Sequence, residues 1–126
     1  MKKLSYDQKV SMMRILLDLA LADGRVDDRE SLFYDRIANL LGLDYQARKD
    51  IDSKSSLLAL TEISGFTQEQ KQEFARLMGK MIVVDEDINY NEIRIYNVVS
   101  DFCKINREFN MEDYPDYVAS SINKTN

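Results

Sequence analysis

An acidic nine-residue segment ending at Glu30 occurs a second time, ending at Glu92, at a constant spacing of 62 residues. Asp23 in the first copy matches Asp85 in the second. An apolar stretch precedes each copy and another follows it, so each copy is expected to form the corner between two helices. The simplest architecture is two helical hairpins packed about a pseudo-two-fold axis, with the two corners free to approach each other.

Apolar residues recur at helical spacing along most of the chain, and only one proline and four glycines interrupt it. This pattern predicts an all-α fold, a single-domain helical bundle of two pseudo-symmetric helix-hairpin halves with about 6–7 helices. The 126 residues are expected to form one domain, 1–126. Its repeat halves are expected over about residues 8–42 and 67–105, and an aromatic C-terminal helix over about 110–122.

The apolar pattern also predicts which segments are buried. The first helix, about residues 7–22, is apolar around most of its surface, which is typical of a helix at the centre of a core. The polar interval 50–56 is expected to be the loosest internal segment. Cys103 lies in an apolar run and is expected to be a buried small hydrophobe rather than a reactive thiol. Tyr114 and the aromatic tail are expected to dock on the body, with a partner surface as the alternative.

Composition excludes several classes of function. The sequence contains no histidine, which removes the Ser-His and Cys-His nucleophile pairs and the usual zinc sites. The net charge is −5 and no track of basic residues is apparent, so nucleic acid is not an expected partner. No apolar stretch is long enough for a signal peptide or a bilayer span, so a cytoplasmic protein without membrane insertion is expected.

Helix capping alone explains the two corners. Asp27 and Asn89 can each cap the helix that follows, and Glu30 and Glu92, three residues further on, complete a capping box. Val26 is expected to tuck into the core. On this hypothesis the acidic residues have a structural role only.

The alternative interpretation is a site for a hard divalent cation, which prefers oxygen ligands. Residues 23–30 reproduce the second half of an EF-hand calcium loop, but the first and third ligand positions of such a loop fall on Leu19 and Leu21. A high-affinity EF-hand is therefore excluded, and any bound Ca²⁺ or Mg²⁺ is expected to be weakly held. The candidate metal-ligating residues are the acidic residues of the two corners: Asp23, Asp27, Glu30, Asp85 and Glu92.

At the first corner, residues 17–30 read Leu-Asp-Leu-Ala-Leu-Ala-Asp-Gly-Arg-Val-Asp-Asp-Arg-Glu, a helix ending in Ala-Asp-Gly with a glutamate seven residues after the aspartate. This motif resembles the TerB-like domain of tellurite-resistance proteins, which is also similar to the N-terminal region of DjlA co-chaperones. The resemblance covers about residues 8–105. It implies an all-helical fold of pseudo-symmetric halves, no enzymatic activity, and an acidic cation site at the five positions named above.

The second corner departs from the family pattern, because Val84-Asp85-Glu86 stands where Ala-Asp-Gly is expected. The sequence also lacks a J domain, so a co-chaperone role does not transfer.

The leading hypothesis is a non-catalytic interaction module, not an enzyme, that presents an acidic surface to a protein partner in a bacterial stress-response-like context. Weak divalent-cation binding accompanies this hypothesis. Two alternatives stay open. One is a metal-dependent hydrolase that uses the clustered carboxylates to hold two cations. The other is a purely structural or oligomerising domain, for which a homodimer is the simplest form.

Overall fold

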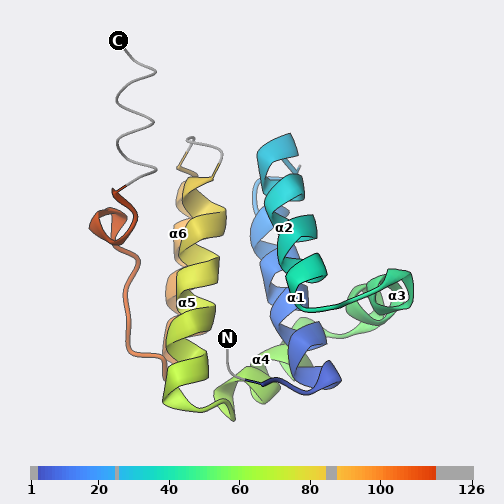
Figure 1. Cartoon of the computed structure of the whole chain (residues 1–126). Helices are drawn as coiled ribbons and strands as arrows, with labels where there is room; N and C mark the ends of the chain where they lie inside the picture. The colour runs from blue at the N-terminus through green and yellow to red at the C-terminus, as the bar shows by residue number, and fades with distance from the viewer. Residues whose placement is uncertain (1–2, 25, 85–87, 116–126) are drawn as a thin grey trace.

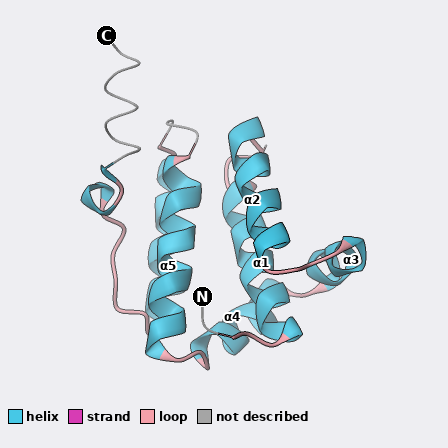
Figure 2. Ribbon diagram, in the orientation of Figure 1, coloured by secondary structure: helices cyan, strands magenta, loops and turns pink. Residues whose placement is uncertain are grey.

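The computed structural model describes residues 3–24, 26–84 and 88–115. Figure 2 shows helices and loops but no strand in this part of the chain, which confirms the all-α class. The elements in chain order are α1 (Tyr6–Ala20), α2 (Asp28–Leu40), α3 (Tyr45–Ser53), α4 (Ser56–Ser64), α5 (Gln68–Val83), α6 (Tyr90–Phe102) and a short 3₁₀ helix, η1 (Met111–Asp113).

Two helical hairpins, α1–α2 and α5–α6, stand side by side (Figure 1). The ends of α1 and α5 and the starts of α2 and α6 all lie at one end of the molecule, at the top of the view, while α4 lies near the opposite end. Helix α1 contacts each of the other α-helices. Both corners are therefore on the same end, as the repeat requires.

The core is centred on α1, as its apolar sequence predicts. Met12, Met13, Leu16 and Leu19 are completely buried, and they belong to the same hydrophobic cluster as Phe74 of α5. A helix that is apolar on most of its surface is stable only when neighbours cover it on several sides. The surrounding helices provide this cover.

The helices repeat at the same spacing of 62 residues as the two acidic segments of the sequence. Helices α2 and α6 both have 13 residues, and they begin at residues 28 and 90. Ser5 caps α1 and Thr67 caps α5, each within a complete capping box. The helix boundaries thus repeat along the chain, whereas superposition of the two halves about an axis stays a prediction.

The ends of α2 and α6 repeat as well. Gly42 has a φ of 71° and Lys104 a φ of 57°, both in the left-handed region. In each case the next residue donates its backbone N–H back to the helix, from Leu43 to the Ala38 carbonyl at 3.0 Å and from Ile105 to the Ser100 carbonyl at 2.9 Å. This geometry is a common way to end a helix, and glycine adopts it at the least cost.

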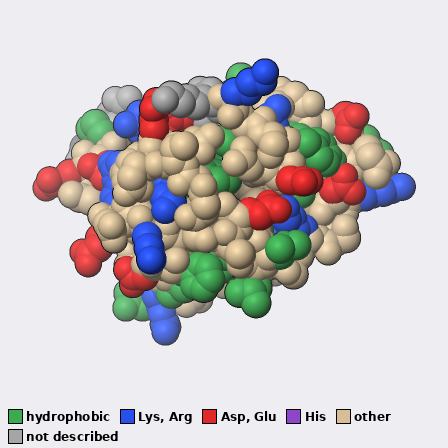
Figure 3. Space-filling view, turned by 90° about the horizontal axis from the view of Figure 1, so that it is seen from below, with side chains coloured by type: hydrophobic (Ala, Val, Ile, Leu, Met, Phe, Trp, Pro, Cys, Tyr) green, Lys and Arg blue, Asp and Glu red, His purple; other side chains and the backbone are tan. Residues whose placement is uncertain are grey.

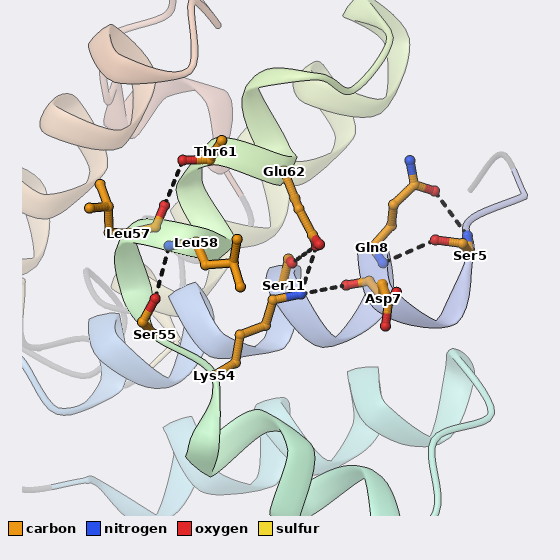
Figure 4. Close-up of polar contacts among 10 residues, drawn as sticks. All are labelled: Ser5, Asp7, Gln8, Ser11, Lys54, Ser55, Leu57, Leu58, Thr61 and Glu62. Atoms are coloured by element: carbon orange, nitrogen blue, oxygen red, sulfur yellow. Dashed lines mark hydrogen bonds and ion pairs between the residues drawn. The ribbon is translucent and has the colours of Figure 1, made fainter.

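A polar cluster joins α1 to the segment before α4 (Figure 4). Lys54 Nζ donates to Glu62 Oε2 at 2.7 Å and to the Asp7 carbonyl at 3.2 Å, and the Ser11 hydroxyl donates to the same Glu62 oxygen. The relative looseness of residues 50–56 stays a prediction, although part of this segment is helical. Residues 50–53 belong to α3, and Ile51 is buried in the core, so one apolar side chain fixes a segment that is otherwise polar.

The chain after α6 returns along the second hairpin and packs on it. The ring of Phe109 packs between the rings of Tyr96 and Tyr114, tilted by 59° to each, at centroid distances of 5.7 and 6.0 Å. Tyr114 is buried, so docking of the tail is confirmed for this residue. The remainder of the C-terminal helix expected over 110–122 lies outside the described residues from position 116 onward.

Candidate cation site at the helix corners

At the first corner the acidic residues cap α2. Asp27 Oδ1 accepts a hydrogen bond from the backbone N–H of Arg29 at 2.8 Å, and Glu30 Oε1 accepts one from the backbone N–H of Asp27 at 3.3 Å. These contacts form the predicted capping box. The hydrogen bond from the Arg29 backbone, together with the nearby Arg29 guanidinium, holds the pKa of Asp27 below its ordinary value. Asp27 is therefore a carboxylate at neutral pH.

The second corner uses the same positions with different chemistry. Asn89 caps α6, and its Oδ1 accepts a hydrogen bond from the backbone N–H of Asn91 at 2.8 Å. Glu92 occupies the third position of α6, as Glu30 does in α2. The amide of Asn89 carries no charge, so the second corner has no carboxylate at the capping position that Asp27 occupies in the first.

Glu30 and Glu92 are both deeply buried, each with a relative exposure of 1%. Burial of a carboxylate costs free energy unless its surroundings compensate the charge. A helix N-terminus offers such compensation, since its backbone N–H groups and the helix dipole favour negative charge. Glu30 is held in place by the hydrogen bond from the Asp27 backbone, and the oxygens of both glutamates are of the type that Ca²⁺ and Mg²⁺ prefer.

The predicted ligand set divides into three environments. Asp23 is exposed, Asp27 is partly exposed, and Glu30 and Glu92 are buried. Asp85 lies outside the described residues. Among the residues that are described, no three Asp, Glu, His or Cys side chains form a group that could hold a metal ion. A site that uses all five residues therefore stays a prediction.

One expectation at the corner is wrong. Val26, which was expected to tuck into the core, is 38% exposed. Helix α1 ends at Ala20, and a turn from Leu21 to Gly24, whose φ is 89°, follows it. The counterpart of Val26, Ile88, does pack against the core, partly buried.

The sequence did not single out a cavity of about 600 Å³ near the start of α1 and the end of α2. Its lining comes from the chain before α1 and from α1, α2 and α5, segments far apart in the sequence. At the end of the molecule opposite the corners, acidic, basic and hydrophobic side chains are interspersed on the surface (Figure 3). No local motif marks such a site, because each segment contributes only a few ordinary residues.

Comparison with known proteins gives a family match and a likeness to solved structures. The family described as tellurite resistance protein TerB matches residues 1–53, which include the whole first hairpin and α3, so the resemblance seen at the first corner is confirmed there. A crystal structure of a protein of unknown function from Porphyromonas gingivalis W83 matches with a TM-score of 0.75 and 21% sequence identity, covering 93% of this chain and 99% of that chain. This second likeness shows the fold. The search of curated proteins found no match.

In the described part of the chain, none of the helices combines the length and the apolar character that crossing a membrane requires.

Proposed function

We propose that this protein is a non-catalytic helical module that binds a protein partner through the end carrying the two corners and holds a divalent cation there weakly. The observation that supports this most is the pair Glu30 and Glu92, two buried carboxylates at the same position of two equivalent helices. The likeness of residues 1–53 to TerB favours a role in a bacterial stress-response-like context.

The side-chain chemistry supports a non-catalytic role. The sequence has no histidine to act as a general base near neutral pH. Burial raises the pKa of Cys103 to about 11, which keeps its thiol protonated and unreactive. Burial likewise raises the pKa of Tyr34 and of Tyr114 to about 12. A hydrolase would need an activated nucleophile, and these groups are poor candidates.

A calcium titration tests whether the protein binds a divalent cation. Suppose the site has a dissociation constant of about 10⁻³ M, in the weak range of protein calcium modules. Ca²⁺ at ten times that concentration would then stabilise the folded protein by about 1.4 kcal/mol. The melting temperature should then rise by a few degrees in Ca²⁺, and the double variant Glu30→Gln with Glu92→Gln should lose the rise. Glu108→Gln, an exposed change away from both corners, should keep it. If the wild type shows no heat in calorimetry and no melting shift in Ca²⁺, the cation site is rejected.

The partner needs a separate experiment. Asp23 is exposed at the first corner, so Asp23→Lys reverses a surface charge without disturbing the core. A partner that crosslinks to the wild type and to Glu108→Lys, but not to Asp23→Lys, would support binding at the corner end. If the same proteins crosslink equally to the wild type, to Glu108→Lys and to Asp23→Lys, binding at the corner end is contradicted.

A further inference from the structure

The cavity near the start of α1 has mostly apolar walls. One wall is formed at the end of α2 by Ile37, Leu40 and Leu41. Leu77 of α5 and Leu4, which precedes α1, also line the cavity. Ile37 and Leu4 are buried, whereas Leu40 is 77% exposed. Leu40 therefore adds exposed apolar area at the rim, which an apolar ligand chain in the cavity can cover.

The polar lining is mainly cationic. Lys3, Lys9 and Arg76 line the cavity, with Glu73 as the only carboxylate among the residues described there. Lys9 Nζ donates to the Leu41 carbonyl at 2.9 Å, which fixes one ammonium group against the wall. Three cations against one anion make this a positive region on a chain whose net charge is −5.

We propose that this cavity binds an amphiphilic monoanion, an acyl chain with a carboxylate head group. The apolar walls would take the chain, and Arg76 and Lys3 at the exposed rim would bind the head group. A volume of about 600 Å³ lies within the range of small-molecule sites, which are typically apolar with a few polar groups that fix orientation. Nothing in the corner site contributes to this cavity, so the inference is independent of the proposed function.

The shape of the cavity favours a small amphiphile over a bound peptide helix. Its longest walls are the end of α2 with the next residue, over 37–41, and residues 73–77 of α5, each about one turn long, while α1 contributes Lys9 alone. A helix bound in a groove needs anchors over about two turns, at positions i, i+3, i+4 and i+7. A wall of one turn offers room for a flexible chain but not for such a row of anchors.

Decanoate below its micelle concentration is a suitable probe, measured by calorimetry and by methyl chemical shifts in the full chain. We expect binding that tightens by about fourfold for each methylene that enters the cavity, in a series from octanoate to dodecanoate. Decylammonium, with the opposite head-group charge, should bind much more weakly. Leu40→Gln should weaken decanoate binding by about fivefold, and Arg76→Gln by about threefold.

Each variant has a matched control. Leu32→Gln changes a leucine on the same helix that is 66% exposed and does not line the cavity. Arg94→Gln changes an exposed arginine on α6, where it lies over the ring of Tyr90. Both controls should bind decanoate like the wild type.

Three results would overturn the proposal. The first is no decanoate binding by the wild type, or equal binding by Leu40→Gln. The second is equal binding of decanoate and decylammonium, which would mean that the cations do not recognise the head group. The third is self-association that Leu40→Gln abolishes while decanoate has no effect, which would assign this face to a second copy of the chain.

Discussion

The Tyr114 hydroxyl lies against α5 in the space that a side chain at Gly79 would fill. A Cβ atom built on Gly79 would overlap both the hydroxyl and the ring of Tyr114. The same hydroxyl donates to the carbonyl of Arg76, at 3.4 Å. The absence of a side chain at position 79 therefore permits the chain after α6 to pack on α5.

This contact predicts an unusual effect for Gly79→Ala. Alanine in place of glycine inside a helix normally stabilises by about 0.5–1 kcal/mol. Here the added methyl group would displace Tyr114, and overpacking of this kind typically costs about 1–3 kcal/mol. We expect Gly79→Ala to lower the free energy of unfolding by about 1–2 kcal/mol in urea titrations.

The Tyr114→Ala background provides the control. Once the ring is gone, Gly79→Ala should stabilise by the usual helix-propensity gain, so the sign of its effect should reverse. Equal effects of Gly79→Ala in the two backgrounds would show that Tyr114 and Gly79 are not coupled.

Features that depend on neighbouring residues could be predicted from the sequence. The capping box of Asp27 and Glu30 requires only four consecutive residues, and Gly42 ends α2 because glycine adopts a left-handed φ readily. The central position of α1 followed from its apolar surface. These elements form because local preference and global packing agree.

Features that depend on distant residues could not be predicted. Nothing near Gly79 indicates that Tyr114 will cover it, and the cavity lined by Leu4, Ile37 and Leu77 exists only after three segments have met. The exposure of Val26 could not be predicted either, because it depends on how the chain runs between α1 and α2. The cation site depends in the same way on how the two corners approach each other.

The helix caps predict equal losses at the two corners. Asp27→Ala and Asn89→Ala each remove the side-chain acceptor of a backbone N–H, and each should lower the free energy of unfolding by about 1 kcal/mol. Asn39→Ala is the control, since this exposed asparagine is inside α2 and caps nothing. Thermal or urea melts that show no loss for either cap variant would contradict the capping role.

Cys103 is expected to be inert in the folded protein. Its thiol is completely buried, donates to the Leu60 carbonyl at 3.4 Å, and has a pKa raised to about 11 by burial. Iodoacetamide at about pH 8, near the ordinary thiol pKa, should label it only after the protein unfolds. Mass spectrometry across a urea series should show labelling that follows the unfolding transition. Rapid labelling of the native protein would place the thiol at an accessible position.

The Glu62 cluster predicts a specific dependence of stability on pH. Burial of Glu62 acts to raise its pKa, but the hydrogen bonds from Lys54 and Ser11 and the Lys54 charge outweigh it, so the pKa is lowered overall. A carboxyl group whose pKa is lower in the folded state stabilises the fold fully above its ordinary pKa of 4.5. That contribution is lost as the pH falls through the lower, folded-state pKa.

Glu62→Gln removes the charge and keeps an oxygen that can accept from Ser11. The variant should unfold more easily than the wild type by about 1 kcal/mol at neutral pH, since Lys54 loses a partly buried ionic partner. In acid the wild-type carboxyl group is itself protonated, so the two proteins should converge in stability. Urea titrations from neutral pH down to about 3, below the ordinary carboxyl pKa, would measure this convergence. A difference that stays constant over that range would mean that the charge of Glu62 does not contribute to stability.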